Sequence, residues 1–164
     1  MSLVIVDTGC ANLSSVKFAF ERLDIPVFIS QEPSDIEAAD KVLIPGVGAA
    51  PYAMEKIKER GLLETLRGLT QPTLGICLGM QLLFETLTEG DVETSGLGLI
   101  PGRVDTLDTK GEPSPHMGWN ALDVFKTVPL LDGINQGDYA YFVHSYAVPI
   151  GNYTIASATY GDSF

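Results

Sequence analysis

One cysteine has the surroundings of a catalytic nucleophile. Cys77 follows a short apolar segment, Thr73–Ile76, and precedes residues Leu82–Phe84, which are expected to open the apolar face of a helix. Gly75 and Gly79 lie two residues before and two residues after Cys77. This is the spacing of the G-x-S-x-G nucleophile elbow, with sulfur in place of oxygen. In such a turn the nucleophile is held in a strained backbone conformation, and the helix N-terminus that follows favours a thiolate.

Other interpretations of the cysteines and glycines stay open. A cysteine at the end of a buried strand is often a small core residue, and we expect that role for Cys10, whose neighbours at ±2 are Thr8 and Asn12. Residues 46–48 begin a G-x-G-x-x-G dinucleotide pattern, but Pro51 occupies the last glycine position and the pair follows the third expected strand. We favour the alternative that small residues there leave N–H groups facing an oxyanion.

Composition and charge exclude several classes of protein. The 164 residues are 45% hydrophobic and 19% charged, as in a globular chain with a substantial core. The net charge of −11 repels phosphate backbones and anionic membranes, so we expect neither nucleic-acid nor membrane binding. No apolar run reaches membrane-spanning length, and no basic segment precedes the first apolar run. Two distant cysteines indicate a reducing, cytoplasmic location and no disulfide.

The first half of the chain alternates strand and helix patterns. Asn12 is expected to cap the first helix, and Ser34–Glu37 has the spacing of a capping box that starts the second. The pattern predicts an α/β fold with an open, mostly parallel twisted sheet and helices on both faces. The expected strands are Leu3–Val6, Pro26–Ser30, Lys41–Ile44 and Thr73–Cys77, and the longer helices are Leu13–Leu23 and Ala50–Leu66.

After Thr88 short β-type segments replace the helices. They are Trp119–Phe125, Tyr139–Val148 and Tyr153–Thr159, and we expect them to be antiparallel strands added to one edge of the sheet. No linker or repeat interrupts the sequence, so residues 1–164 are expected to form a single domain. Sites in open parallel sheets form beyond the carboxyl ends of the strands. The turns at Asp7–Asn12, Pro45–Gly48 and Cys77 all follow strands, and are expected to meet there.

Five sequence strings together carry a specific resemblance. The chain resembles the class I glutamine amidotransferases, and within them the glutaminase subunits of imidazole glycerol phosphate synthase. The resemblance runs from Leu3 to the last residue and implies a flavodoxin-like fold, with no cofactor and no metal. The strings that carry it are Asp7–Leu13, Pro45–Gly48, Gly75–Gln81, Pro115–Asn120 and Tyr141–Tyr146.

The resemblance also implies roles for individual residues. Cys77 would attack the side-chain amide of glutamine, release ammonia and form a thioester that water hydrolyses. The oxyanion would be held by the backbone N–H of Leu78 and by one N–H from Gly46, Val47 or Gly48. The glutamine pocket would be lined by Gln81, His144, Ser145 and Tyr146.

A partner follows from the same resemblance. Ammonia would pass to a β/α-barrel cyclase that forms a heterodimer with this chain near Trp119, Asn120 and Tyr141. The cyclase would make imidazole glycerol phosphate and AICAR in histidine biosynthesis. Trp119 could instead be a core residue, and His144 could be a core histidine with satisfied hydrogen bonds. We expect His116 to be a loop histidine with a structural hydrogen bond.

One departure from the family concerns the base. A cysteine nucleophile needs one, and the family supplies it from a His-Pro-Glu string near the C-terminus. The 164 residues contain no such string, and both histidines match other family motifs. We therefore expect the domain to be truncated at its C-terminal end and the 164-residue chain to be inactive. The alternatives are an inactive binding module that docks on the cyclase and a glutaminase subunit of another synthase.

Overall fold

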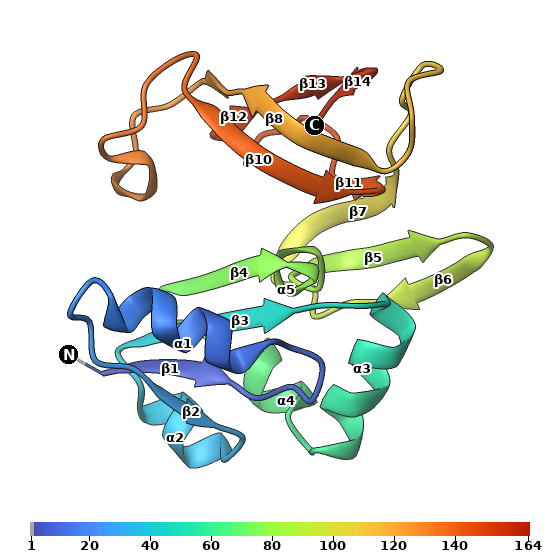
Figure 1. The fold of residues 1–164 in the computed structure, drawn as a ribbon. Coiled ribbons are helices and arrows are strands. Elements are labelled where there is room, and N and C mark those ends of the chain that lie inside the picture. The colour runs from blue at the N-terminus through green and yellow to red at the C-terminus, as the bar shows by residue number, and fades with distance from the viewer. Residues whose placement is uncertain (1) are drawn as a thin grey trace. The chain divides into compact units, whose positions relative to one another are not determined.

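A four-stranded parallel sheet organises the first half of the chain (Figure 1). The computed structural model describes residues 2–164, which fall into two compact units, one up to Arg103 and one from Val104 to Phe164. In the first unit the strand order is β2-β1-β3-β4, and every neighbouring pair is parallel. The strands are β1 Leu3–Val6, β2 Phe28–Ser30, β3 Lys41–Gly46 and β4 Thr73–Cys77.

Helices cover both faces of this sheet, as the alternating pattern predicts. Helix α1 (Leu13–Glu21) lays Leu13, Val16 and Phe20 against a cluster formed by Leu3, Ile5 and Leu43. Successive strand residues point to opposite faces, so Val4, Val42 and Ile44 face the other side. Because crossovers between parallel strands are right-handed as a rule, we expect the remaining helices on that side, and each of them has fully buried apolar side chains. These helices are α2 Pro33–Ala38, α3 Ala50–Glu59 and α4 Leu63–Arg67, with buried Ile36, Met54, Ile57 and Leu66.

Two helix expectations are wrong in detail. The single helix expected over Ala50–Leu66 is broken by Gly61, whose φ of +69° turns the chain between α3 and α4. The capping box at Ser34 does not form. Helix α2 begins one residue earlier, at Pro33, because proline has the φ of a first helical residue, and Glu32 provides no side-chain cap. The cap at Asn12 is confirmed, since its side-chain oxygen accepts from the Ser15 N–H at 3.2 Å.

The segment after Cys77 also differs from expectation. Helix α5 (Leu78–Gln81) is a single turn, and Phe84 already begins strand β5 (Phe84–Glu89) instead of lying on a helix. Tertiary hydrogen bonds end the helix. The Leu82 carbonyl accepts from the Leu97 N–H at 2.8 Å, and the Leu83 carbonyl accepts from Leu99 and Ile100. Carbonyls bound by a distant segment are not available to continue a helix. Strand β6 (Val92–Ser95) pairs with β5 in an antiparallel hairpin, and β7 is Ile100–Thr106.

The second unit contains only short strands and one 3-10 turn. Its main element is an antiparallel pair, β8 (His116–Ala121) with β10 (Tyr139–His144). The shorter elements are β9 Asp123–Val124, η1 Pro129–Leu131, β11 Tyr146–Ala147, β12 Ala156–Ser157, β13 Thr159–Tyr160 and β14 Asp162–Ser163. The antiparallel character expected after Thr88 is confirmed. Strand β11 pairs with β7, the other strands of this unit form two-stranded sheets, and none of the strands described here pairs with the parallel sheet. The single domain over residues 1–164 stays a prediction.

Across residues 2–164 no helix is long and apolar enough to cross a membrane. Cys10 and Cys77 are both free thiols.

Candidate active site

Cys77 occupies a strained turn between strand β4 and helix α5. Its φ is +56° and its ψ is −122°, a combination that side chains rarely adopt. Cys77 is the last residue of β4 and the N-cap of α5, and it is exposed to solvent. The structure therefore has the strand-to-helix elbow that the glycine spacing predicts. Its role as nucleophile stays a prediction.

Three glycines make this elbow possible. A Cβ atom at Gly75 would overlap the Cα atom of Met80 and lie 2.6 Å from its nitrogen. At Gly79 a Cβ would overlap the carbonyl oxygen of Ile44 on the neighbouring strand, and at Gly46 it would lie 2.6 Å from the Gly79 nitrogen. These neighbours are backbone atoms, which cannot move aside as a flexible side chain can. The glycines therefore let helix α5 begin directly against the end of strand β3.

The expected oxyanion donors lie beside Cys77, but one of them is engaged. Gly46 pairs in register with Cys77, and Leu78 is the first residue of α5. The Val47 N–H donates to the Cys10 carbonyl oxygen at 2.8 Å. An N–H that already donates at this distance cannot also bind an oxyanion, so this bond must open before Val47 can act as a donor.

Two further residues of the first unit complete the surroundings of the elbow. Gln81 lies on α5 one turn beyond Cys77 and is 9% exposed, and its pocket-lining role stays a prediction. Cys10 is 6% exposed, and burial raises the pKa of its thiol above the ordinary value. Lys56 and Arg60 oppose that shift and Asp7 adds to it. A buried thiol of raised pKa is a poor nucleophile, which agrees with the structural role expected for Cys10.

The β8–β10 hairpin of the second unit has one exposed apolar face. Trp119 and Tyr141 are register partners with ring centroids 5.6 Å apart in an edge-to-face arrangement. They are 68% and 55% exposed, and their neighbours Met117 and Val143 are exposed as well. Trp119 is therefore not a core residue in this structure. We call these four residues the hairpin face.

The opposite face of the hairpin holds a chain of hydrogen bonds. A carbonyl oxygen can only accept, so the His144 Nδ1 that lies 3.0 Å from the Tyr146 oxygen must carry a proton. In neutral His144 the Nε2 atom then accepts from His116 Nδ1 at 2.8 Å. Asn120 Nδ2 donates to the Thr159 carbonyl at 2.8 Å and lies 3.5 Å from His116 Nε2. This arrangement suits two neutral imidazole rings.

The same arrangement corrects one expectation and bears on a second. His116 is the first residue of strand β8 and is 3% exposed, so it is not a loop histidine, although it has the structural hydrogen bond expected. The resemblance implies a place for Asn120 beside Trp119 at the partner interface. Adjacent strand residues point to opposite faces, and the Asn120 side chain lies on the face opposite Trp119, where it donates to the Thr159 carbonyl. Its place at the partner interface stays a prediction.

Burial lowers the pKa of His116 below its ordinary value, and the charge of His144 lowers it further. As pH falls through about 6.5, the unfolded chain takes up a proton that the folded chain resists, so the free energy of unfolding should decrease. We expect urea unfolding to show this loss between roughly pH 7.5 and roughly pH 5.5. His116→Gln keeps an N–H donor but does not titrate, and it should show a smaller loss. An equal loss of unfolding free energy in both proteins would contradict the assignment of a neutral imidazole ring to His116.

The expected site residues fall into two groups. Cys77, Leu78, Gln81 and residues 46–48 are brought together in the first unit around the elbow. The other group, His144, Ser145, Tyr146, Trp119, Asn120 and Tyr141, belongs to the second unit. In that group the Ser145 carbonyl accepts from the Leu107 N–H at 2.9 Å. The substrate-binding roles of these residues stay predictions.

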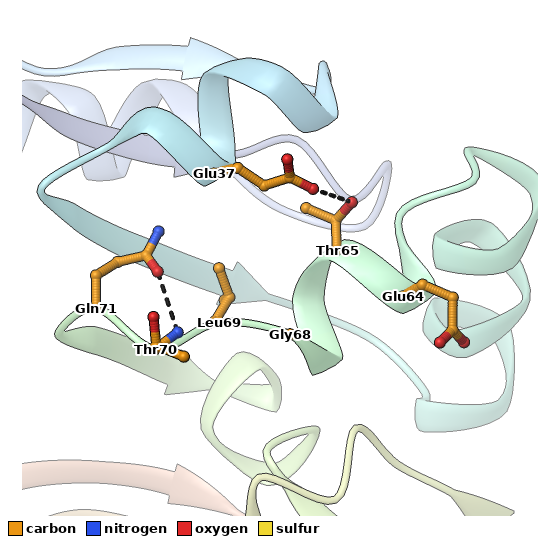
Figure 2. Close-up of a pocket in the computed structure, with 7 residues that line it drawn as sticks. All are labelled: Glu37, Glu64, Thr65, Gly68, Leu69, Thr70 and Gln71. Carbon is orange, nitrogen blue, oxygen red and sulfur yellow. Dashed lines mark hydrogen bonds between the residues drawn. The ribbon is translucent and has the colours of Figure 1, made fainter.

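A separate hollow lies on the first unit, away from the elbow. Figure 2 shows its lining, with Thr65 directed toward Glu37 and Gln71 beside Thr70. Its volume is about 320 Å³, and Gln71 precedes β4, whereas Cys77 ends that strand. The hollow is therefore at the other end of β4 from the candidate nucleophile. It is lined by Glu37, Glu64, Thr65, Gly68, Leu69, Thr70 and Gln71.

Comparisons with known proteins agree with this geometry. The family model described as "Glutamine amidotransferase class-I" matches residues 4–160. The imidazole glycerol phosphate synthase subunit HisH of Colwellia psychrerythraea is 53% identical, over 98% of this chain and 77% of its own length. The subunit of the same name from Mannheimia succiniciproducens is 52% identical, over 99% of this chain and 82% of its own.

Solved structures support the fold. A crystal structure of a glutamine amidotransferase superposes with a TM-score of 0.70 at 17% identity, over 97% of this chain and 85% of that chain. A putative GMP synthase protein from Thermoplasma acidophilum superposes with a TM-score of 0.67 at 15% identity, over 98% of this chain and 74% of that chain.

Proposed function

Since the chain belongs to the class-I glutamine amidotransferase family, we propose that it is the glutaminase subunit of an imidazole glycerol phosphate synthase. It hydrolyses glutamine to glutamate and ammonia, and a cyclase subunit uses the ammonia in histidine biosynthesis. The strained elbow at Cys77 is the observation that carries this proposal, because it presents a solvent-exposed thiol at the end of a parallel strand. The assignment to imidazole glycerol phosphate synthase, rather than to another synthase, rests on the names of the similar proteins.

The chemistry proceeds by covalent catalysis. The Cys77 sulfur attacks the side-chain amide carbon of glutamine, and the carbonyl π electrons move onto the oxygen. The proton that the thiol gives up passes to the amide nitrogen, so collapse of this intermediate expels ammonia and leaves a glutamyl thioester. Water then cleaves the thioester to glutamate and free thiol. The Leu78 N–H stabilises the oxyanion, and Val47 joins it once its bond to the Cys10 oxygen opens. Gln81, on the same helix as Leu78, orients the substrate in this proposal. The family resemblance also implies substrate contacts from His144, Ser145 and Tyr146 of the second unit.

The proposed partner is a β/α-barrel cyclase in a one-to-one complex. The hairpin face supports it, because four exposed apolar side chains in register form a ready anchor for another protein. Ammonia must reach its acceptor without escaping into solvent, so we also propose that the partner seats over the end of the sheet that carries Cys77. The family assignment further supports a cytoplasmic location.

Trp119→Ala tests the partner directly. We expect the variant to weaken cyclase binding by about 2 kcal/mol or more, because Trp119 is the largest side chain of the hairpin face. It should also lower the coupling of glutamine hydrolysis to cyclase turnover while the protein remains folded. Calorimetric titration against the cyclase, with both activities followed, provides the measurement.

Leu130→Ala is the matched control for Trp119→Ala. Leu130 is 62% exposed in η1, outside the hairpin face, and its replacement should leave affinity and coupling unchanged. If Trp119→Ala also leaves both unchanged, the docking surface lies elsewhere.

A second candidate function is a binding module without glutaminase activity. The hydrogen-bond chain favours it, since the ring nitrogens of His116 and His144 are engaged and neither ring is prepared to act as a base. We expect the 164-residue chain to release no measurable ammonia from glutamine, even with the cyclase added. The companion experiment uses an extended chain, in which a segment with the family's His-Pro-Glu string follows Phe164. Turnover by the extended chain alone supports the enzyme, whereas turnover by the 164-residue chain would show that another group acts as base.

A further inference from the structure

Arg60, at the end of helix α3, contacts Asp7 in the loop after strand β1 through one guanidinium nitrogen. Its Nη1 atom lies 3.1 Å from the Asp7 carboxylate oxygen Oδ2 and donates to the Asp7 backbone carbonyl at 3.1 Å. The same atom donates to Gln31 Oε1 at 2.6 Å. Arg60 is the C-cap residue of α3, so its backbone is fixed by the helix. The guanidinium therefore ties two segments that follow neighbouring strands, β1 and β2.

The guanidinium of Arg60 lies where a side chain at position 9 would begin. A Cβ atom at Gly9 would lie 2.9 Å from Arg60 Nε and 3.0 Å from Nη2, closer than side chains pack. The φ of Gly9 is +82°, and its N–H donates to Asp7 Oδ1 at 2.9 Å. Asp7 thus holds Arg60 with one carboxylate oxygen and the turn at Gly9 with the other. The Asp7 carboxylate therefore connects the guanidinium to the turn at Gly9.

The residue after Gly9 carries the carbonyl that engages Val47. Cys10 follows directly in the chain, and its oxygen accepts the Val47 N–H at 2.8 Å. The position of this carbonyl depends on the turn at Gly9, which in turn depends on Asp7 and Arg60. Arg60 is thus connected to Val47 through Asp7, the turn at Gly9 and the Cys10 carbonyl.

We propose that Arg60 is a positioning residue that keeps the Cys10 carbonyl on the Val47 N–H and so holds back an oxyanion donor. Its catalytic consequence rests on the proposed glutaminase function, but the clamp itself does not. Loss of Arg60 frees the loop, and the Val47 N–H spends more time unbound. The chain then needs less help from a partner to complete its oxyanion hole.

A purely structural ion pair would behave differently. Arg60 and Asp7 are 30% and 29% exposed, and pairs at such positions contribute little to global stability. The discriminating quantity is therefore local, namely the opening of the Val47–Cys10 hydrogen bond. Arg60→Met removes the charge and the donors, whereas Arg60→Lys keeps the charge but loses the guanidinium, whose nitrogen Nη1 contacts both Asp7 and Gln31.

Amide hydrogen exchange, followed by NMR, measures this opening residue by residue. We expect Val47 to exchange about tenfold faster in Arg60→Met and also faster in Arg60→Lys. Ile44, buried in the centre of the sheet, is the internal reference and should be unchanged. If Val47 exchanges at the wild-type rate in both variants, or if Ile44 accelerates by the same factor, Arg60 is not a clamp on this loop.

The catalytic consequence is tested in the extended chain. Without cyclase, Arg60→Met should raise kcat for glutamine hydrolysis several-fold, and the saturated rate with cyclase should stay near wild type. Equal changes with and without cyclase would overturn the proposed link to the oxyanion donor. If no variant hydrolyses glutamine, the proposed function fails, while the exchange data still decide whether Arg60 clamps the loop.

Discussion

Cys77→Ser in the extended chain is expected to lower the rate of glutamine hydrolysis by about a thousandfold or more. The substitution nearly conserves volume, so the elbow and the fold should persist. What it removes is the easily ionised sulfur, because a serine hydroxyl is a far weaker nucleophile without strong activation. Steady-state assays of glutamate formation, with circular dichroism to check the fold, provide the measurement.

Cys10→Ser is the control for this substitution. Cys10 is buried, with a thiol of raised pKa, and its backbone carbonyl is retained in the variant. We expect a change in rate of only a few-fold. Near-normal hydrolysis by Cys77→Ser would show that Cys77 is not the nucleophile, and a greater loss in Cys10→Ser than in Cys77→Ser would reverse the assignment.

Gly79→Ala is expected to lower the free energy of unfolding by about 3 kcal/mol or more. The new Cβ would overlap the Ile44 carbonyl oxygen and lie 2.7 Å from its carbon. Both atoms belong to the backbone of β3 in the centre of the sheet, so helix α5 must move away from the strand. Urea unfolding of the variant and the wild type measures the difference.

Gly61→Ala separates this overlap from the ordinary cost of replacing a glycine. A Cβ at Gly61 meets no atom within 4 Å, although the φ of +69° makes the substitution strained. We expect a loss of about 1 kcal/mol there. If Gly79→Ala costs no more than Gly61→Ala, helix α5 is not held against β3 as the structure shows.

Local sequence signals predicted the elements that depend on nearby residues. Strand β1 coincides with the apolar run Leu3–Val6, and the Asn12 cap forms as its position suggests. The strain at Cys77 also follows from local spacing, because Gly75 and Gly79 leave room that no other residue could. Apolar runs, caps and glycine spacing are properties of short segments, and they are visible without tertiary contacts.

Features that depend on distant contacts were missed. The helix after Cys77 ends after one turn because Leu97 and Leu99 bind the carbonyls of Leu82 and Leu83, and no local signal announces this. Likewise, nothing in the sequence around Arg60 indicates that it reaches Asp7, which lies fifty-three positions away.

The candidate site shows the same division. The resemblance implied one donor among Gly46, Val47 and Gly48, but only the structure shows that the Val47 N–H is bound to the Cys10 carbonyl. The histidines were expected in separate roles, a loop residue and a pocket residue. Their mutual hydrogen bond depends on the pairing of β8 with β10, which brings His116 and His144 into register.

The most direct test of the central claim is covalent labelling with an electrophilic glutamine analogue. The extended chain is incubated with the analogue in the presence of the cyclase, and the modified peptide is identified by mass spectrometry. We predict a single label on Cys77, blocked by excess glutamine, with Cys10 unmodified. A label on Cys10, or a label on Cys77 that glutamine does not block, would contradict the account of this chain as a cysteine glutaminase.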